Sequence, residues 1–141
     1  KEFEVFNNGN MSRDFTYVGD IVESIKRLLP LAPQENNPAF NPKKPTSSKS
    51  TKAYQIFNIG NNSPVALMDY IKALEKVLNK KGKIVFKPMQ PGDVKSTYAN
   101  VESLFNYIDF KPETTIEDGV KAFVKKYLEL EKLKNSKGFK S

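Results

Sequence analysis

Apolar residues recur along this chain with two different spacings, and each spacing predicts a different kind of element. Residues 2–6 alternate polar and apolar side chains and then meet Asn7-Asn8-Gly9-Asn10, a pattern typical of a strand that ends in a turn. Residues 14–18 alternate in the same way. The sequence therefore predicts two short strands near its beginning, over 2–6 and 14–18.

Helical spacing replaces this alternation from residue 20 onward. A stripe of apolar positions predicts a helix that Asp20 caps at its start and Pro30 ends. A second stripe predicts another helix, with Ser63 as its cap and Pro64 as its first residue, where the missing N–H costs nothing. Two amphipathic helices are therefore expected in the first half of the chain.

The rest of the chain repeats both patterns. Residues 53–59 and 83–87 are rich in β-forming side chains and predict two more strands. Asn100 is placed to cap a short helix. Thr115 and Asp118 have the spacing of a capping box at the start of the last helix.

A long connection interrupts these elements. Residues 31–52 hold four of the nine prolines and four lysines, with few large apolar side chains, so we expect a flexible loop there. At 141 residues the chain has the length of one domain. The prediction is a small α/β domain of the α+β type over 1–141, with short strands and three to four helices.

The net charge of +7 is concentrated at one end of the chain. Residues 121–141 carry seven lysines and two glutamates, which gives +5, whereas residues 53–120 balance to zero. A solvated face of the last helix and a basic tail over 132–141 account for this distribution. Nucleic-acid binding would need stacking aromatics among the basic residues, and the tail has only Phe139. We therefore expect no nucleic-acid partner.

The absence of cysteine and histidine removes the usual thiolate nucleophile, imidazole base and zinc ligands. Tyr107 and Lys111 have a Tyr-x-x-x-Lys spacing used by some dehydrogenases, but Pro112 follows directly and residues 109–110 indicate a turn. No glycine cluster opens a helix after a strand, as a dinucleotide site requires. We expect no catalytic, metal or cofactor site within this chain.

The chain also lacks an apolar run long enough to cross a bilayer, and its first residues are not an apolar signal stretch. We expect no membrane partner and, because a cysteine-free composition suits a reducing compartment, a cytoplasmic location. The chain begins with Lys1 and enters a strand pattern almost at once. We therefore expect it to be part of a longer polypeptide.

Loops rich in amide and anion-binding groups remain as candidates for binding. Gln90-Pro91-Gly92-Asp93 predicts a rigid turn, and Arg13 lies at the start of a predicted strand rather than on a helix face. A guanidinium in that position can form a bidentate contact with a phosphate. It can equally form a surface ion pair with Asp14 or Glu23, and composition leaves both interpretations open.

Several motifs follow one another in order along the chain. They are residues 5–18 (VFNNGNMSRDFTYV), 54–61 (YQIFNIGN), 90–94 (QPGDV), 97–99 (TYA) and 110–112 (FKP). Together they resemble the extended short-chain dehydrogenase/reductases that epimerise nucleotide sugars, and among these the UDP-glucuronate 4-epimerases. The resemblance covers nearly the whole chain outside the predicted loop.

This resemblance implies a set of substrate-binding residues. Val5 and Phe6 match the strand end that packs on or hydrogen-bonds the uracil, Arg13 matches the arginine that grips the diphosphate, and Asp93 matches the acid that meets the ribose hydroxyls. Gln90 stands where some relatives carry a second phosphate-binding arginine, so one charge-assisted contact is weakened or lost there.

The resemblance also implies what lies outside this chain. The family binds NAD on an N-terminal Rossmann half that carries the catalytic Tyr-x-x-x-Lys, so this chain would be the C-terminal substrate-binding lobe without the Rossmann half. It would anchor the UDP of UDP-glucuronate or a related UDP-hexose during C4 epimerisation by transient oxidation, and be inactive alone. Expected partners are the UDP-sugar, its own Rossmann domain and, at full length, a second copy in a homodimer. The alternative is a non-catalytic nucleotide- or protein-binding module.

Overall fold

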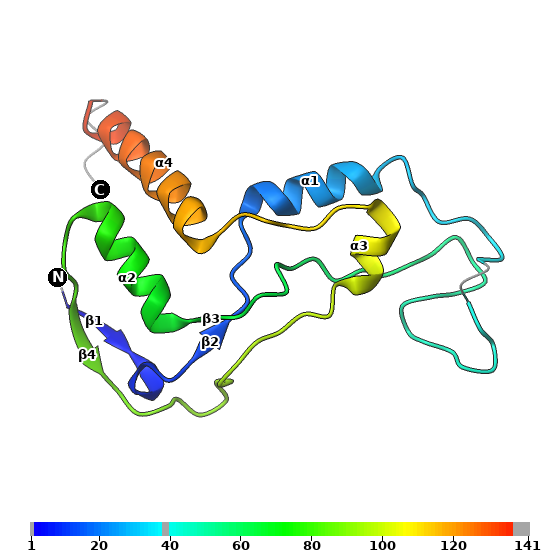
Figure 1. Cartoon of the computed structure of the whole chain (residues 1–141), viewed down its shortest axis with the longest axis horizontal. Helices are drawn as coiled ribbons and strands as arrows, with labels where there is room; N and C mark the ends of the chain where they lie inside the picture. The colour runs from blue at the N-terminus through cyan, green and yellow to red at the C-terminus, as the bar shows by residue number, and fades with distance from the viewer. Residues whose placement is uncertain (1, 38–39, 137–141) are drawn as a thin grey trace. The chain divides into compact units, whose positions relative to one another are not determined.

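The computed structural model describes residues 2–37 and 40–136 and contains both helices and short strands (Figure 1). Its helices are α1 (Val18–Leu28), α2 (Leu67–Leu78), α3 (Glu102–Ile108), α4 (Ile116–Ser136) and the short 3-10 helix η1 (Phe6–Gly9). Its strands are β1 (Glu2–Val5), β2 (Ser12–Arg13), β3 (Val65–Ala66) and β4 (Lys83–Phe86). The prediction of an α/β fold with short strands and three to four helices is confirmed.

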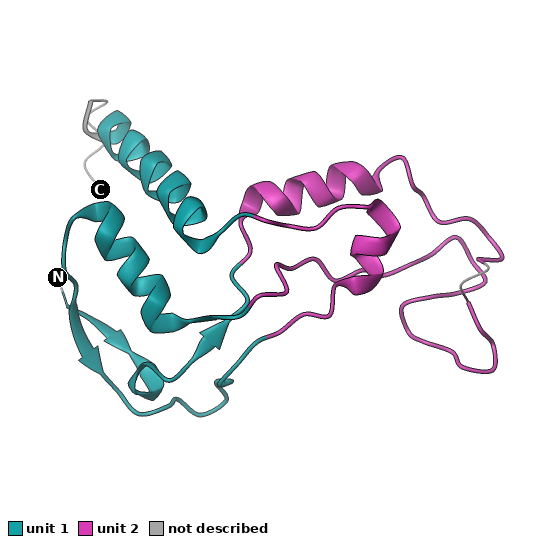
Figure 2. Cartoon of the chain, in the orientation of Figure 1, with its two compact units in different colours: residues 1–15, 64–97, 114–141 teal, residues 16–63, 98–113 magenta. Residues whose placement is uncertain are grey.

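The chain forms two compact units rather than one continuous body (Figure 2). Unit 1 comprises residues 1–15, 64–97 and 114–141, and unit 2 comprises residues 16–63 and 98–113. All four strands lie in unit 1 together with α2 and α4, whereas unit 2 contains α1, α3 and the long connection. The region predicted as one domain over 1–141 therefore divides into two compact units.

Unit 1 is built from two small sheets and a helix pair. Strand β1 runs parallel to β4, and β2 pairs antiparallel with β3. Helices α2 and α4 pack together through Ala73, Val120 and Val124, all of which are buried (Figure 1). Strands β1 and β2 belong to different sheets, and η1 connects them within a few residues. Gly9 makes this possible: its φ is +80°, and a Cβ there would lie 2.9 Å from the Met68 sulfur.

Two sequence predictions about the segments around β2 and β3 were wrong. Residues 14–18 form no strand; β2 lies earlier, at Ser12–Arg13, because these residues pair with Val65–Ala66. The same pairing removes Ser63 and Pro64 as the start of α2, which begins only at Leu67. The Leu67 N–H donates to the Met11 carbonyl (2.8 Å), so the residues before the helix serve the sheet instead.

The predicted strand over 53–59 was also wrong. Only Gln55 bridges another residue, Lys49, and the flanking residues form no ladder. A β-rich sequence becomes a strand only where a neighbouring strand supplies hydrogen bonds, and unit 2 offers none to this segment. Residues 31–37 and 40–52 contain turns but no helix or extended strand, as their composition predicts; their flexibility stays a prediction.

Of the helix caps that the sequence predicts at Asp20, Asn100 and Thr115, the structure confirms the last two. Helix α1 begins at Val18 with Tyr17 before it, so Asp20 lies in the first turn, where its charge favours the helix N-terminus, and is not the cap. The Asn100 Oδ1 accepts a hydrogen bond from the Glu102 N–H (3.2 Å), and the Thr115 Oγ1 accepts one from the Asp118 N–H (3.2 Å). Both predicted capping side chains therefore bond to the helices that they precede.

Part of the predicted basic tail is helical. Helix α4 continues through Ser136 and includes the first part of the predicted basic tail over 132–141. Along this stretch, Lys134 pairs with Glu131 (3.4 Å). Residues 137–141 lie outside the described part of the chain.

Candidate functional site

The turn after β4 places an acidic side chain on a rigid support. Asp93 donates its backbone N–H to the Gln90 carbonyl (3.2 Å), which closes a four-residue turn. Pro91 fixes its own φ, and Gly92 follows with a φ of +81°, the arrangement of a type II turn. The predicted turn is therefore present, and it holds the backbone of Asp93 at a set position.

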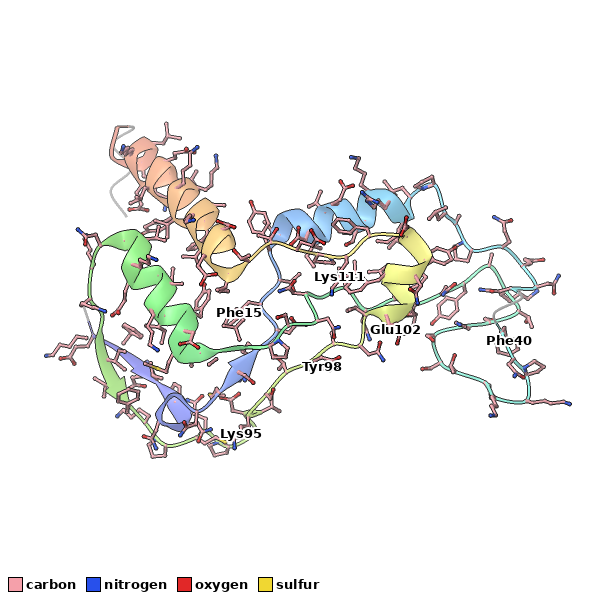
Figure 3. The ribbon with its side chains drawn as sticks, viewed as in Figure 1. Phe15, Phe40, Lys95, Tyr98, Glu102 and Lys111 are labelled. Carbon is pink, nitrogen blue, oxygen red and sulfur yellow. The ribbon has the colours of Figure 1, made fainter. Side chains whose placement is uncertain are left out.

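Strand β2 places the guanidinium of Arg13 next to the segment that follows this turn. The Ser12 N–H donates to the Lys95 carbonyl (3.0 Å), and the Thr97 N–H donates to the Ser12 carbonyl (3.3 Å), so the segment that follows the turn lies beside β2. Figure 3 labels Lys95 on this segment. The Ser12 and Ser96 hydroxyls also meet at 2.7 Å. Arg13, next along β2, is consequently held beside the residues that carry Asp93.

One of the residues that follow β2 packs on α2. Phe15 stacks on Tyr70 of that helix, with ring centroids 4.3 Å apart and planes 8° from parallel (Figure 3). The Asp14 N–H donates to the Thr97 Oγ1 (3.3 Å). These contacts on the residues after Arg13 restrict where its backbone can move.

Arg13 and Asp93 form a direct ion pair. The Arg13 Nη2 lies 3.0 Å from the Asp93 Oδ1, and the two side chains are 27% and 29% exposed. The Arg13 Nη1 donates to the carbonyls of Ser12 (2.8 Å) and Lys95 (3.4 Å). The Asp93 Oδ1 also accepts the Val94 N–H (2.8 Å). A positive and a negative group are thus fixed together, both partly open to solvent.

This geometry decides which ion pair Arg13 forms. The predicted alternatives were Asp14 and Glu23, and both are replaced by Asp93. Glu23 instead binds Arg27 (2.8 Å) and Lys26 (3.3 Å) on its own helix, and these hydrogen bonds lower the pKa of its carboxyl.

The side chains of the other predicted site residues form no hydrogen bond to the pair among residues 2–37 and 40–136. Val5 is buried, and its carbonyl accepts the Lys87 N–H (2.9 Å), so its backbone serves the β1–β4 sheet. Phe6 is half-buried and begins η1. Gln90 is exposed and joins the site through its backbone carbonyl in the turn. The structure therefore brings Arg13 and Asp93 into contact and joins Gln90 to Asp93 through the backbone of the turn. Val5 and Phe6 make no hydrogen bond to the pair among the described residues.

Tyr107 and Lys111 lie on different kinds of backbone segment. Helix α3 ends at Ile108, and Asp109 adopts a left-handed conformation, so Lys111 lies beyond the helix that carries Tyr107. Figure 3 labels Lys111 on that extended segment. The Tyr107 hydroxyl donates to the Leu31 carbonyl (2.8 Å) and stabilises unit 2. The two residues therefore do not share one helix, as the turn at residues 109–110 predicts; that their spacing is a coincidence stays a prediction.

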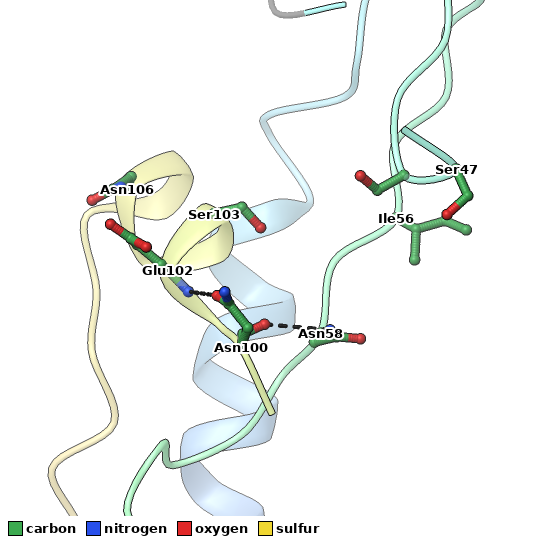
Figure 4. Close-up of a pocket in the computed structure, with 8 residues that line it drawn as sticks. Ser47, Ile56, Asn58, Asn100, Glu102, Ser103 and Asn106 are labelled. Carbon is green, nitrogen blue, oxygen red and sulfur yellow. Dashed lines mark hydrogen bonds between the residues drawn. The ribbon is translucent and has the colours of Figure 1, made fainter. Parts of the chain in front are cut away.

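Unit 2 contains a polar pocket that sequence reasoning missed (Figure 4). Its volume is about 500 Å³, and amides and hydroxyls line it around one carboxylate, that of Glu102. The Asn58 Nδ2 donates to the Asn100 carbonyl across it (3.3 Å). The sequence identified Asn100 only as a helix cap and gave no sign of a pocket, because single asparagines and serines in loops are usually turn formers.

Among residues 2–37 and 40–136, no three acidic, histidine or cysteine side chains gather closely enough to hold a metal ion. Within the same ranges, none of the helices combines the length and the apolar character that a membrane span needs. The ion pair and the turn that carries Asp93 are therefore the arrangement with the clearest binding chemistry.

Known proteins are similar to this chain in sequence and in fold. The family model described as GDP-mannose 4,6 dehydratase matches residues 1–123. Protein CapI of Staphylococcus aureus is 52% identical over 126 residues, which cover 89% of this chain and 37% of CapI. A probable UDP-glucuronate 4-epimerase of Rhizobium meliloti is 38% identical over 128 residues, again 37% of its length. The chain thus spans little more than a third of these relatives.

A solved structure has the same fold. The UDP-glucuronic acid 4-epimerase of Bacillus cereus, in complex with UDP-glucuronic acid and NAD, superposes with a TM-score of 0.69 at 24% identity. The match covers 92% of this chain and 36% of that one. The predicted resemblance to nucleotide-sugar epimerases is thereby confirmed. Since the family pattern extends over residues 1–123, the chain belongs to the GDP-mannose 4,6 dehydratase family.

Proposed function

We propose that this chain is the substrate-binding lobe of an NAD-dependent nucleotide-sugar epimerase, and that it anchors the UDP of UDP-glucuronate or a related UDP-hexose. The observation that carries the proposal is the Arg13–Asp93 pair, held at 3.0 Å by β2 and the Gln90–Asp93 turn. It supplies a cation for a diphosphate and an acceptor for ribose hydroxyls in one place. The relatives named UDP-glucuronate 4-epimerase support this choice of ligand.

Each residue has a separate task in this proposal. Arg13 contacts the diphosphate, and Asp93 accepts hydrogen bonds from the ribose. The strand end at Val5 and Phe6 faces the uracil. Gln90 adds a neutral hydrogen bond where an arginine would add a charged one. Charge-assisted contacts are stronger than neutral ones, so most of the affinity should depend on Arg13.

Firm binding of UDP suits the chemistry of a C4 epimerase. Transient oxidation at C4 gives a ketone that must present both faces to the same hydride donor. The sugar therefore has to turn while the nucleotide stays in place. Most of the binding energy should then come from contacts with UDP rather than with the sugar. NAD supplies the hydride chemistry when it is bound, and the residues of this chain hold the substrate.

The NAD site and the catalytic Tyr-x-x-x-Lys belong, in this proposal, to a Rossmann half outside this chain. The glycines of the present sequence are isolated and form no phosphate-binding loop at a helix start. By itself the chain should bind UDP without turning over a UDP-sugar. We further propose that the full-length protein acts in the cytoplasm as a homodimer.

Replacement of Arg13 tests the proposal. Arg13→Ala should weaken UDP binding by roughly 1.5–3 kcal/mol, the range for a hydrogen bond to a charged group. Isothermal titration calorimetry on the full-length protein measures this loss. The matched control is Arg27→Ala, which removes the other arginine of the sequence, one that binds Glu23 and lies over the Phe110 ring.

The outcome separates a nucleotide site from other interpretations. UDP should shift amide resonances at Phe6, Arg13, Gln90 and Asp93 in a labelled sample, and leave those of α3 in place. Unchanged UDP affinity in Arg13→Ala, or an equal loss in Arg27→Ala, would reject the proposed role of Arg13.

A further inference from the structure

The segment after the Gln90–Asp93 turn carries a lysine that the proposed function does not use. Lys95 lies two residues after Asp93. Its backbone carbonyl accepts the Ser12 N–H (3.0 Å) and a hydrogen bond from the Arg13 Nη1 (3.4 Å). The backbone of Lys95 is therefore in direct contact with the guanidinium of Arg13.

The pairing of this segment with β2 decides on which face the Lys95 side chain lies. Ser12 and Ser96 form a parallel bridge, and their hydroxyls meet at 2.7 Å, so these two side chains lie on one face. Successive side chains along an extended segment point to opposite faces. Arg13 follows Ser12, and Lys95 precedes Ser96. The alternation therefore assigns Arg13 and Lys95 to the same, opposite face.

Lys95 differs in its charge environment from the two lysines of the preceding strand and its end. Lys83 pairs with Glu2, and Lys87 pairs with Glu4 (3.5 Å). Among residues 2–37 and 40–136, no carboxylate forms an ion pair with Lys95, and the residue is exposed. The ammonium of Lys95 is therefore available to a ligand that approaches Arg13.

This ammonium changes the net charge of the site. The charges of Arg13 and Asp93 cancel within their contact of 3.0 Å, and Gln90 at the start of the turn is neutral. These three side chains together offer a polyanionic diphosphate hydrogen bonds but no net charge. With Lys95 the site becomes cationic. Attraction between its ammonium and phosphate oxygens then adds to the hydrogen bonds that Arg13 donates.

We infer that Lys95 is a further substrate-binding residue, and that its ammonium contacts the phosphates of the nucleotide beside Arg13. This inference rests on the proposed function and adds a residue to it. The two cations have different tasks. Arg13 is a planar donor held by two carbonyls and by Asp93, so it orients the phosphates. Lys95 is a point charge on a flexible stem, so it adds attraction without fixing an orientation.

Calorimetry with UDP and an NMR titration with uridine test the inference on the full-length protein. Lys95→Met keeps the aliphatic stem and removes the charge. It should weaken UDP binding about two- to fivefold, the range that corresponds to one exposed ion pair. Its affinity for uridine should equal that of the wild type, because uridine has no phosphate. Lys95→Arg keeps the charge and should bind UDP as tightly as the wild type.

A matched control separates a local contact from the overall charge of the protein. Lys76 lies in the last turn of α2, is exposed and, within the described part of the chain, pairs with no carboxylate. Lys76→Met therefore removes the same charge from the same unit and should leave the affinity for UDP unchanged. Equal losses in Lys76→Met and Lys95→Met would overturn the inference.

The failures of the two proposals look different. If the wild type does not bind UDP, the proposed nucleotide site is wrong and the inference falls with it. If UDP binds and requires Arg13, but Lys95→Met binds it as tightly as the wild type, the anchoring function stands and the inference alone is overturned. An equal loss of UDP affinity in Lys95→Arg, or an equal loss of uridine affinity in Lys95→Met, also overturns it, because the charge of Lys95 would not be the cause.

Discussion

The ion pair between Arg13 and Asp93 predicts a measurable coupling in stability, independent of any ligand. The perturbation is a double-mutant cycle of Arg13→Met, which keeps the aliphatic stem, and Asp93→Asn, which keeps the shape and an acceptor for the Val94 N–H. Their combination removes both charges. The cycle isolates the interaction between the two side chains from the cost of each single change.

The distance and exposure of the two side chains set the magnitude of this coupling energy. At a separation of 3.0 Å, two unit charges in water attract by about 1.4 kcal/mol. Fully exposed pairs yield about 0.2–1 kcal/mol because solvent screens them and ordering costs entropy. Since the side chains are 27% and 29% exposed, we expect a coupling near the upper end, about 1 kcal/mol. Arg13→Met should cost more than Asp93→Asn, because it also loses the carbonyls of Ser12 and Lys95.

Urea unfolding followed by far-UV circular dichroism gives the free energy of unfolding of the wild type and the three variants. The coupling should decrease as salt is added, because ions screen partly exposed charges. A coupling within about 0.3 kcal/mol of zero at low salt would refute the reasoning, since that is the usual error of additivity for independent sites. Arg13 and Asp93 would then lie close together without stabilising each other.

Three further predictions concern parts of the fold that support the site or unit 2. Leu104 is fully buried, so Leu104→Ala should lower the free energy of unfolding by about 2–5 kcal/mol in a thermal denaturation experiment. Gly92→Ala should cost about 1–2 kcal/mol, because φ is +81° there while no atom lies within 4 Å of an added Cβ; a much larger loss would indicate a clash instead. Hydrogen bonds from Lys81 and the Gly82 N–H lower the pKa of Glu75 below its ordinary value of 4.5, so its contribution to stability is present above that pH and is lost as pH falls through the lowered pKa. Glu75→Gln should flatten the dependence of the unfolding midpoint on pH below about 4.5, and an unchanged dependence would contradict the assignment.

Local patterns determined much of the fold. The apolar stripes predicted α1 and α2, and the alternating residues predicted β1, because side chains that repeat along one element face one environment. The capping box predicted the start of α4, and a run of β-forming side chains predicted β4. Local chemistry also predicted the turn at Gln90–Asp93, where Pro91 and Gly92 have the backbone preferences that the turn needs. These features depend on residues a few positions apart, so one sequence is enough to find them.

Tertiary structure decided which strands pair and which side chains meet. Residues 53–59 have strand-forming side chains but no neighbouring strand, whereas the two residues of β2 form a strand because β3 lies beside them. Arg13 and Asp93 are 80 positions apart, and no local pattern distinguished this partner from Asp14 or Glu23. Sequence supplied a guanidinium and a carboxylate of the right chemistry; only the long-range hydrogen bonds of β2 set them 3.0 Å apart, because contact between distant segments depends on the whole chain path.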